Sequence, residues 1–235
     1  MSFLSPVEAT DSALKATGIQ RAYDAPGGRL VVLSAVDLTV PRGMFLAIVG
    51  VSGAGKSTLL NILGTLDRPD GGTLEIRGRR IHDLSERELA NFRARRLGFV
   101  FQFHHLLPEF SAEENVMMPL LIAGETRAVA QQRARTSLEA VGLMERWEHR
   151  PSELSGGEAQ RVAVARALVA EPELVLADEP SGNLDHRSAN ALHELLASIV
   201  RDRHQTLVVV THNDKLASLA HHILKLEDGR LVPVH

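Results

Sequence analysis

The amino-acid sequence contains no cysteine, and it has a single tryptophan and a single tyrosine. Without cysteine the chain has neither disulfide bonds nor thiolate metal ligands, which is typical of proteins in reducing compartments. No stretch approaches the ~18 consecutive apolar residues of a membrane span, and residues 1–16 lack the basic and apolar pattern of a targeting segment. We therefore expect a soluble, cytoplasmic protein, and any passage through a membrane would belong to another chain.

A large excess of one charge is also missing. The formal net charge is −3, and the Lys and Arg residues are dispersed, so the sequence shows no electrostatic footprint for nucleic acid or anionic lipid. The length of 235 residues and the hydrophobic fraction of 44% are sufficient for one large α/β domain, or for a core with an inserted subdomain.

Four short apolar runs predict buried strands of a parallel sheet, and a polar group follows each of them. The runs are Met44 to Val49, Leu97 to Phe101, Leu174 to Ala177 and Leu207 to Val210. They are followed, in order, by a glycine-rich loop, Gln102, Asp178 with Glu179, and Thr211 with His212. Because ligands of open parallel sheets bind outside the carboxyl ends of the strands, these groups are predicted to line one site.

The remaining pattern predicts two further parts around this core. Residues 30–33 and 36–40, with the Pro26-Gly27-Gly28 turn before them, are typical of antiparallel strands that pair with residues 73–77. Helical patterns follow Gln102, with a capping-box start at Ser111 and a helix of residues 127–141 that ends at Gly142.

The prediction is therefore a single domain, 1–235. A nucleotide-binding core with an antiparallel β subdomain covers 13–102 and 167–235, and an inserted helical subdomain covers 103–166. A hairpin is predicted around Glu227-Asp228-Gly229-Arg230.

The loop Gly50–Ser57 has the strand, glycine-rich loop and helix pattern in which backbone N–H groups converge on phosphate oxygens. Lys56 would neutralise the β- and γ-phosphates, and the Ser57 hydroxyl would bind Mg²⁺. The alternative, an ordinary glycine-rich turn, fits the complete Gly-Lys-Ser ending poorly. The predicted nucleotide contacts are Gly50, Ser52, Gly53, Ala54, Gly55, Lys56, Ser57 and Thr58.

The two carboxylates after the third run are predicted to divide the chemistry. Asp178 would hold Mg²⁺, and Glu179 would orient or deprotonate the water that attacks the γ-phosphate. Gln102 would contact the metal or this water, and His212 would hydrogen-bond the γ-phosphate. Without the phosphate loop, an acidic loop before Pro180 and a histidine that merely ends a strand would be the preferred interpretations.

A second anion site is predicted at Leu154-Ser155-Gly156-Gly157-Glu158. Ser155 can cap a helix, and Glu158 completes a capping box. The helix N-terminus, with Gly156 and Gly157 that admit close approach, can in addition bind phosphate. Because the chain already has one phosphate loop, this second segment makes most sense if it completes the site of another subunit.

The set of motifs resembles the nucleotide-binding subunits of ABC transporters over nearly the whole chain. The motifs occur in the family's order: Tyr23 as the adenine-stacking aromatic, Gly50 to Ser57 as Walker A, Gln102 as the Q-loop, Leu154 to Gln160 as the signature, Leu174 to Asp178 as Walker B with Glu179 as catalytic base, Ser181 to Asp185 as the D-loop, and His212 as the switch histidine. From sequence alone, a plain packing role for Tyr23 is nearly as good an interpretation. The resemblance implies a head-to-tail dimer with two ATPs, each held between the Walker loop of one copy and Ser155 and Gly157 of the other.

Within the family, the segment from Phe101 to Phe110 with Glu114-Asn115-Val116 resembles the ATPases of lipoprotein-releasing systems. That resemblance implies release of lipoproteins from the inner membrane, with transmembrane subunits of the LolC and LolE kind as partners. ATPases of macrolide exporters and of cell division share much of the pattern. Ala159 stands where arginine is usual in this subfamily, and Ser181 where threonine is usual.

Two other classes of protein fit the sequence less well. Soluble ABC ATPases of chromosome maintenance or translation typically carry coiled-coil insertions or a second ATPase domain, which 235 residues without heptads do not accommodate. A nucleotide kinase or GTPase does not account for the segment from Leu154 to Gln160, and the Asn-Lys-x-Asp motif that reads a guanine base is missing.

Overall fold

The computed structural model describes residues 12–25 and 28–234, and its centre is a six-stranded sheet in the order β10-β9-β3-β8-β7-β6. Five of these strands are parallel, and β10 pairs antiparallel with β9 at one edge. The strands are β3 (Phe45–Val49), β6 (Leu97–Val100), β7 (Leu174–Asp178), β8 (Leu207–Val210), β9 (His222–Glu227) and β10 (Arg230–Pro233). All four apolar runs and the C-terminal hairpin are thus confirmed as strands, with shifts of one residue at some ends.

A second, antiparallel sheet has the order β2-β1-β4-β5. Its strands are β1 (Ser12–Ala25), β2 (Gly28–Pro41), β4 (Gly71–Ile76) and β5 (Arg79–Arg80). The predicted sheet exists, but the predicted pairing was wrong, because β1 lies between β2 and β4 and pairs with both. The alternation of buried Leu14 and Ala16 with exposed Lys15 and Thr17 is the strand signal that the prediction did not use.

Residues 30–33 and 36–40 belong to one continuous strand, β2. The interruption between them is local, because Ala35 has a positive φ of 56° and the Ser34 N–H donates to the Gly229 carbonyl of the C-terminal hairpin. Pro26 and Gly27 of the predicted turn lie outside the described residues.

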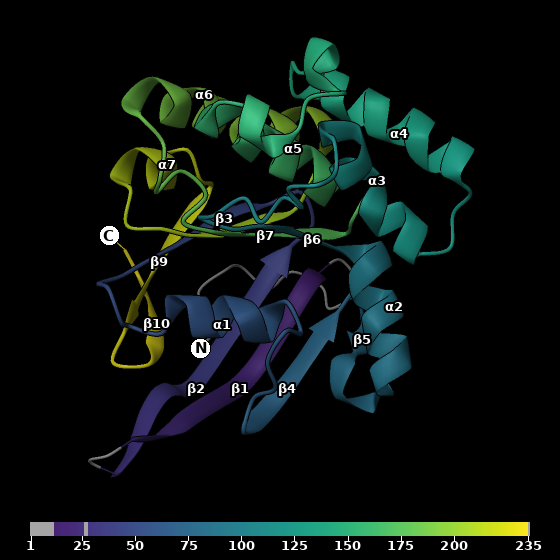
Figure 1. The fold of residues 1–235 in the computed structure, drawn as a ribbon. Coiled ribbons are helices and arrows are strands. Elements are labelled where there is room, and N and C mark those ends of the chain that lie inside the picture. Colours follow the sequence, from purple (N-terminus) through teal and green to yellow (C-terminus); the bar gives the residue numbers. More distant parts are fainter. Residues whose placement is uncertain (1–11, 26–27, 235) are drawn as a thin grey trace.

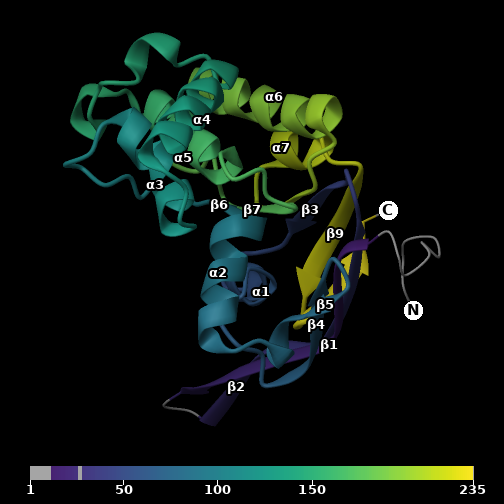
Figure 2. The same cartoon turned by 90° about the vertical axis from the view of Figure 1, so that its right-hand side faces the viewer.

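Helices cover both faces of the large sheet (Figure 1). The antiparallel sheet and α1 lie on one side, and the helices of the middle and last parts of the chain lie on the other, an arrangement that Figure 2 shows from a second direction. The helices are α1 (Lys56–Leu63), α2 (Glu86–Arg96), α3 (Ala112–Ile122), α4 (Arg127–Ala140), α5 (Gly156–Leu168), α6 (His186–Arg203) and α7 (Asp214–Ser218), with short 3₁₀ turns at Ile81–Asp83, Met144–Arg146 and Pro151–Glu153.

The large sheet separates two apolar cores. Along β8, Leu207 and Val209 pack with the helices α3 to α6, whereas Val208 and Val210 pack with α1, α2 and the antiparallel sheet. Successive side chains of a strand point to opposite faces, so a strand covered on both sides reads as a continuous apolar run. This double coverage is why the four runs were recognisable in the sequence.

The helical segment begins and ends with the predicted local signals. Ser111 caps α3 in a capping box with Glu114, and Gly142 follows α4 with a positive φ of 71°. The segment shares one apolar core with the large sheet, and α5 continues two residues beyond the predicted subdomain boundary at 166. The division into 13–102, 103–166 and 167–235 remains a prediction.

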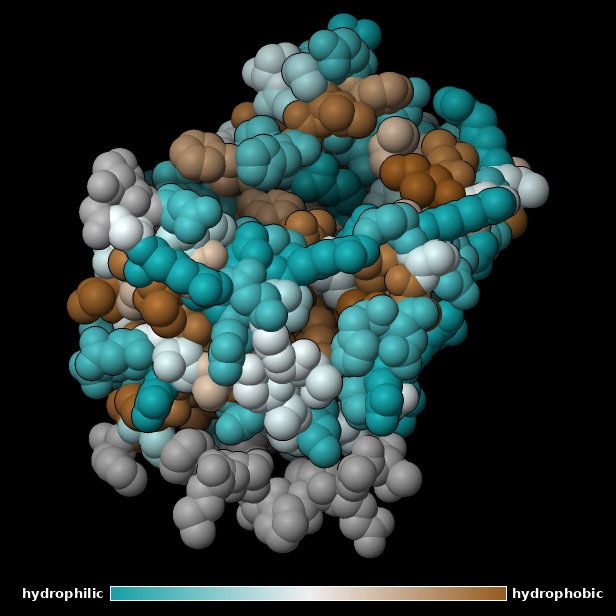
Figure 3. Space-filling model, turned by 90° about the horizontal axis from the view of Figure 1, so that it is seen from below, coloured by the Kyte–Doolittle hydropathy of each residue, from teal (hydrophilic) through white to brown (hydrophobic). Residues whose placement is uncertain are grey.

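The surface seen from below carries small groups of hydrophobic residues between hydrophilic ones (Figure 3). Scattered apolar side chains of this kind are usual on folded proteins. Among residues 12–25 and 28–234, no helix has both the length and the apolar character needed to cross a membrane.

Close contact between α5 and β6 depends on the glycine in that strand. A Cβ on Gly98 would lie 2.4 Å from the Ala167 carbonyl oxygen, and this oxygen belongs to helix backbone that cannot move aside alone. We expect Gly98→Ala to lower the free energy of unfolding by about 1–3 kcal/mol through overpacking.

Gly71→Ala is the matched control, because its Cβ would approach no atom closer than 3.4 Å, the side-chain oxygen of Gln20. Urea denaturation of both variants measures the difference. Equal midpoints for the two variants would show that α5 can move away from β6 without cost.

Candidate functional site

The polar groups predicted from the sequence gather at one edge of the large sheet. Residues Ile48 of β3 and Asp178 of β7 are both paired with Val210 of β8, and Val100 of β6 is paired with Ala177. The carboxyl ends of these four parallel strands are therefore level with one another. The first residue of the glycine-rich loop, Gln102, the two carboxylates and His212 each lie no more than two residues from these paired positions.

The loop after β3 is closed around the side chain of Lys56. The Lys56 ammonium donates to the carbonyl oxygens of Gly50 at 2.8 Å and Val51 at 3.0 Å, and only 8% of the residue is exposed. Gly55 has a positive φ of 96° and lies against β2, so that a Cβ there would be 2.6 Å from Val32 Cγ1. The loop thus combines a buried cation with backbone that only glycine allows, which suits a phosphate group.

Two side chains with oxygen atoms that can bind a metal, those of Ser57 and Asp178, lie near Lys56. The Ser57 hydroxyl, in the first turn of α1, lies close enough to the carboxylate of Asp178, at the end of β7, to influence the pKa of that carboxyl. Burial raises the pKa of the Asp178 carboxyl; the negative charge of Glu179 acts in the same direction, while the Ser57 hydroxyl and the Lys56 charge oppose it. Hydroxyl and carboxylate oxygens are the ligands that Mg²⁺ prefers, so this pair fits a magnesium ion.

Glu179 is held by the residues that directly follow β8, the neighbouring strand. Its carboxylate accepts hydrogen bonds from the Thr211 hydroxyl at 3.0 Å and the His212 backbone N–H at 3.3 Å, and it contacts the ring nitrogen Nδ1 of His212 at 2.7 Å. The Glu179 backbone has a positive φ of 43°, which is unusual for a residue with a side chain. The structure therefore places the predicted base and the predicted histidine in direct contact, and the His212 ring is largely exposed.

Gln102 is bound to the loop that follows the carboxylates. Its side-chain N–H donates to Asn183 Oδ1 at 3.1 Å, and the Asn183 amide donates back to the Gln102 carbonyl oxygen at 3.3 Å. Asp185, in the same loop, caps α6 by accepting from the N–H groups of Arg187 and Ser188. The sequence indicated Gln102 and Asp185, but not their partners.

The segment at Ser155 has the predicted capping geometry. The Glu158 N–H donates to Ser155 Oγ at 3.3 Å, and the Glu158 carboxylate accepts from the Ser155 N–H at 2.9 Å and from its hydroxyl at 2.8 Å. Ser155 and Gly156 are exposed, and a Cβ on Gly157 would lie 2.8 Å from Ser188 Oγ. The N-terminal end of the 13-residue helix α5 is thus open to an anion from outside this chain.

Tyr23 lies on β1 near the glycine-rich loop. It is paired with Leu30 of β2, two residues before the Val32 that covers Gly55. The ring is 38% exposed, its hydroxyl donates to Asp67 at 3.1 Å, and the guanidinium of Arg21 lies 4.7 Å from the ring centre. These contacts fix the orientation of the ring while leaving part of it accessible.

Comparison with known proteins identifies the family of this site. Residues 33–182, which include the glycine-rich loop, the Ser155 segment and both carboxylates, match the family model described as ABC transporter. The chain belongs to the ABC transporter family of ATPases.

Individual relatives match this ABC ATPase over almost its entire length. It is 53% identical to the lipoprotein-releasing system ATP-binding protein LolD of Geobacter metallireducens, a match that covers 94% of this chain and 98% of the relative. It is also 53% identical to the LolD protein of Bordetella pertussis, with coverage of 95% and 97%. Among solved structures, the dimeric ATP-binding cassette MJ0796 in a post-hydrolysis state with ADP and Pi is 36% identical, with a TM-score of 0.84 and coverage of 93% and 96%.

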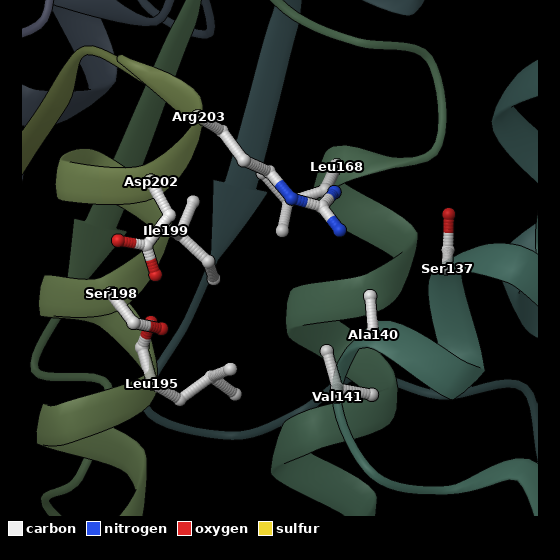
Figure 4. A pocket seen from close by; sticks show the side chains of 9 residues that line it. All are labelled: Ser137, Ala140, Val141, Leu168, Leu195, Ser198, Ile199, Asp202 and Arg203. Carbon is white, nitrogen blue, oxygen red and sulfur yellow. The ribbon is translucent and has the colours of Figure 1, made fainter.

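A separate pocket of the ABC ATPase lies between the ends of α4, α5 and α6 (Figure 4). Leu168, Leu195 and Ile199 line it, with Asp202 and Arg203 at one end. None of the predicted site residues lines this pocket.

The capping box of α5 gives a prediction about acid stability. The bonds from Ser155, supported by Arg146, lower the pKa of Glu158 from 4.5 to about 2. A depressed pKa means that the carboxylate contributes stability above pH 4.5, and that this contribution is lost as the pH falls through about 2. We expect Glu158→Gln to lower the free energy of unfolding at pH 7 by about 0.5–1 kcal/mol, because it removes a negative charge at the N-terminus of α5 and beside Arg146 while Ser155 still caps the helix.

Unfolding measured from pH 7 down to pH 2 checks this prediction, because the gap between the wild-type protein and Glu158→Gln should close on the acid side. Glu148→Gln, the same chemical change at an exposed site, should leave the curve unchanged. A gap of constant size at all pH values would assign the effect to packing instead of charge.

Proposed function

We propose that this ABC ATPase is the ATP-binding and ATP-hydrolysing subunit of a complex that releases lipoproteins from the bacterial inner membrane towards the outer membrane. The observation that carries this assignment is the 53% identity to LolD proteins over 94% of the chain, together with the strand-end site described above. An ATPase of a macrolide-exporter-like or cell-division complex is the second candidate, because the sequence pattern is shared with those ATPases.

The phosphates of ATP would be bound by Gly50, Ser52, Gly53, Ala54, Gly55, Lys56, Ser57 and Thr58. The Lys56 ammonium, which now contacts two carbonyl oxygens of the loop, would turn to the β- and γ-phosphates, a stronger partner. Ser57 and Asp178 would hold Mg²⁺, and Gln102 would join them after leaving Asn183. The metal would neutralise charge on the phosphates as the terminal bond breaks.

Glu179 would act as general base for hydrolysis. A water attacks the γ-phosphorus, its proton passes to the Glu179 carboxylate, and ADP leaves with the electron pair of the broken bond. His212 would release its contact with Glu179 and hydrogen-bond the γ-phosphate. The short His212 to Glu179 contact supports this proposal, because it places both groups within reach of the same reacting atoms.

A second copy of the chain would complete each site. Ser155, Gly156 and Gly157 of one copy would approach the nucleotide bound to the loop of the other, and Asp185 would be a further nucleotide contact. The exposure of Ser155 and Gly156 supports this arrangement, as does the dimeric state of MJ0796. Tyr23 would stack on the adenine ring.

Transmembrane subunits of the LolC and LolE kind would bind on the segment after Gln102, so that the protein lies peripherally on the cytoplasmic side of the inner membrane. This segment exposes large apolar side chains: Phe103 is 64% exposed, Leu107 39% and Phe110 36%. Large apolar side chains exposed along one short segment favour a protein interface there.

Glu179→Gln tests the hydrolysis proposal. We expect it to keep ATP binding and to lower kcat by about 100-fold or more, the size of a general base contribution, so that ATP-bound dimers accumulate in gel filtration. Glu171→Gln, which changes an exposed glutamate at the opposite edge of the sheet, should behave as wild type. A Glu179→Gln protein that hydrolyses ATP normally would remove Glu179 from the role of base.

Dimer formation gives a separate prediction. If each site needs residues from two copies, ATPase activity per molecule of the isolated chain should rise steeply with protein concentration. Turnover measured over a dilution series checks this, and an activity per molecule that stays constant down to concentrations at which the chain is monomeric would contradict the shared site.

The membrane partners are tested with the Glu179→Gln protein as bait. Tagged protein with ATP is recovered from detergent-solubilised host membranes, and mass spectrometry identifies the bound chains. We expect transmembrane subunits together with lipoproteins. Efflux or cell-division subunits would favour the second candidate, and soluble or nucleic-acid partners alone would contradict a transport role.

A further inference from the structure

A buried histidine lies beneath the loop that joins Glu179 to α6. His193 is the eighth residue of α6 and is 3% exposed, and its Nε2 lies 2.8 Å from the hydroxyl oxygen of Ser181, which belongs to a residue 7% exposed. On this helix the neighbouring buried residues Leu192 and Leu196 are apolar. Burying an imidazole among apolar side chains costs free energy unless the ring is hydrogen-bonded, and the bond to Ser181 supplies this partner. The presence of a polar ring at this buried position therefore calls for an explanation.

Ser181 belongs to a loop whose backbone is fixed at both ends. The Gly182 N–H donates to the Glu179 carbonyl oxygen at 2.9 Å, and the Leu184 N–H donates to the Ser181 carbonyl oxygen at 3.2 Å. These bonds form tight turns directly after the left-handed backbone of Glu179. A shift of Ser181 would therefore be transmitted to Glu179, two residues before it.

The same loop is bound from the opposite side by Gln102. Asn183, two residues after Ser181, exchanges hydrogen bonds with the Gln102 side chain and carbonyl oxygen. A Cβ on Gly182 would lie only 3.0 Å from Gln102 Nε2, so the two segments are in close contact. His193 thus supports, from inside the protein, the loop that Gln102 contacts from outside.

The hydrogen bond between His193 and Ser181 can hold the loop in one position. Burial and the positive charge of Lys215 lower the pKa of His193, while Glu194 acts in the opposite direction. The ring is therefore neutral at pH 7, and a neutral imidazole bound to a hydroxyl involves no buried charge. Pro180 and Ser181 are buried and Leu184 packs against the helical core, so among these residues Ser181 is the one that is held in the interior by a side-chain hydrogen bond.

We propose that His193 is a positioning residue for ATP hydrolysis: its bond to Ser181 fixes the loop that sets the place of Glu179 and of the Asn183 contact with Gln102. This inference depends on the proposed function, since it assigns a role in the reaction proposed for the same site. His193 does not touch the nucleotide. Displacements of about 1 Å in a catalytic arrangement cost about 100-fold in rate, so a partial loss of support should lower turnover and leave ATP binding intact.

The test uses four single variants at His193 and Ser181, one double variant and one control variant, all in the full chain. We expect His193→Phe and Ser181→Ala each to lower kcat by about 10-fold, with KM for ATP unchanged within about twofold. His193→Gln and Ser181→Thr keep a hydrogen-bonding group and should stay within about threefold of wild type. The double variant His193→Phe with Ser181→Ala should be no slower than either single variant, because both changes remove the same bond.

Leu196→Met is the matched control, because it alters a buried residue of the same helix whose apolar side chain forms no hydrogen bond. Thermal unfolding of every variant separates loss of stability from loss of turnover. Wild-type kcat in His193→Phe, additive losses in the double variant, or an equal loss in Leu196→Met would overturn the proposal. If His193→Phe does not fold, Ser181→Ala and the two conservative variants decide the proposal in the same way. A wild-type protein without ATPase activity would instead contradict the proposed function itself.

Discussion

The structure depends on the level ends of four parallel strands. Because β3, β8, β7 and β6 are hydrogen-bonded in register, whatever follows each strand arrives at one edge of the sheet. A slip of one residue in this register would turn every side chain of a strand to the opposite core. The two cores, with helices on one face and the antiparallel sheet on the other, prevent such a slip and hold the groups at the strand ends in place.

At this edge the groups are first bonded to one another. Lys56 contacts its own loop, Ser57 lies near Asp178, Glu179 contacts Thr211 and His212, and Gln102 contacts Asn183. The present partners of Lys56 and Gln102 are neutral oxygen atoms, and charge-assisted bonds to phosphate are stronger than bonds to neutral groups. Under the proposed function, nucleotide binding would be an exchange of partners by side chains that the sheet already holds at one edge.

The strands, the hairpin and the capping boxes could be predicted from sequence because their signals are local. A buried strand needs a run of apolar residues, and a cap needs serine and glutamate three residues apart. Contacts between distant segments gave no such signal. The bond between Gln102 and Asn183 and that between Ser181 and His193 depend on how α6 and the loops pack. The order of the antiparallel sheet was missed for a different reason, because β1 itself was not predicted although its alternating residues carry a local strand signal.

The place of β3 has a consequence for synthesis of the chain on the ribosome. β3 spans residues 45–49, but its two neighbours in the sheet are β8 and β9, which span residues 207–210 and 222–227. A nascent chain that has already produced the phosphate loop therefore lacks both strands that support it. The antiparallel sheet can form early, because β1, β2 and β4 all lie within the first 76 residues, whereas the central sheet must wait for nearly the whole chain. Late pairing of distant strands is slow and leaves apolar edges exposed, so the long interval before β9 emerges is the period in which this chain most needs protection by chaperones.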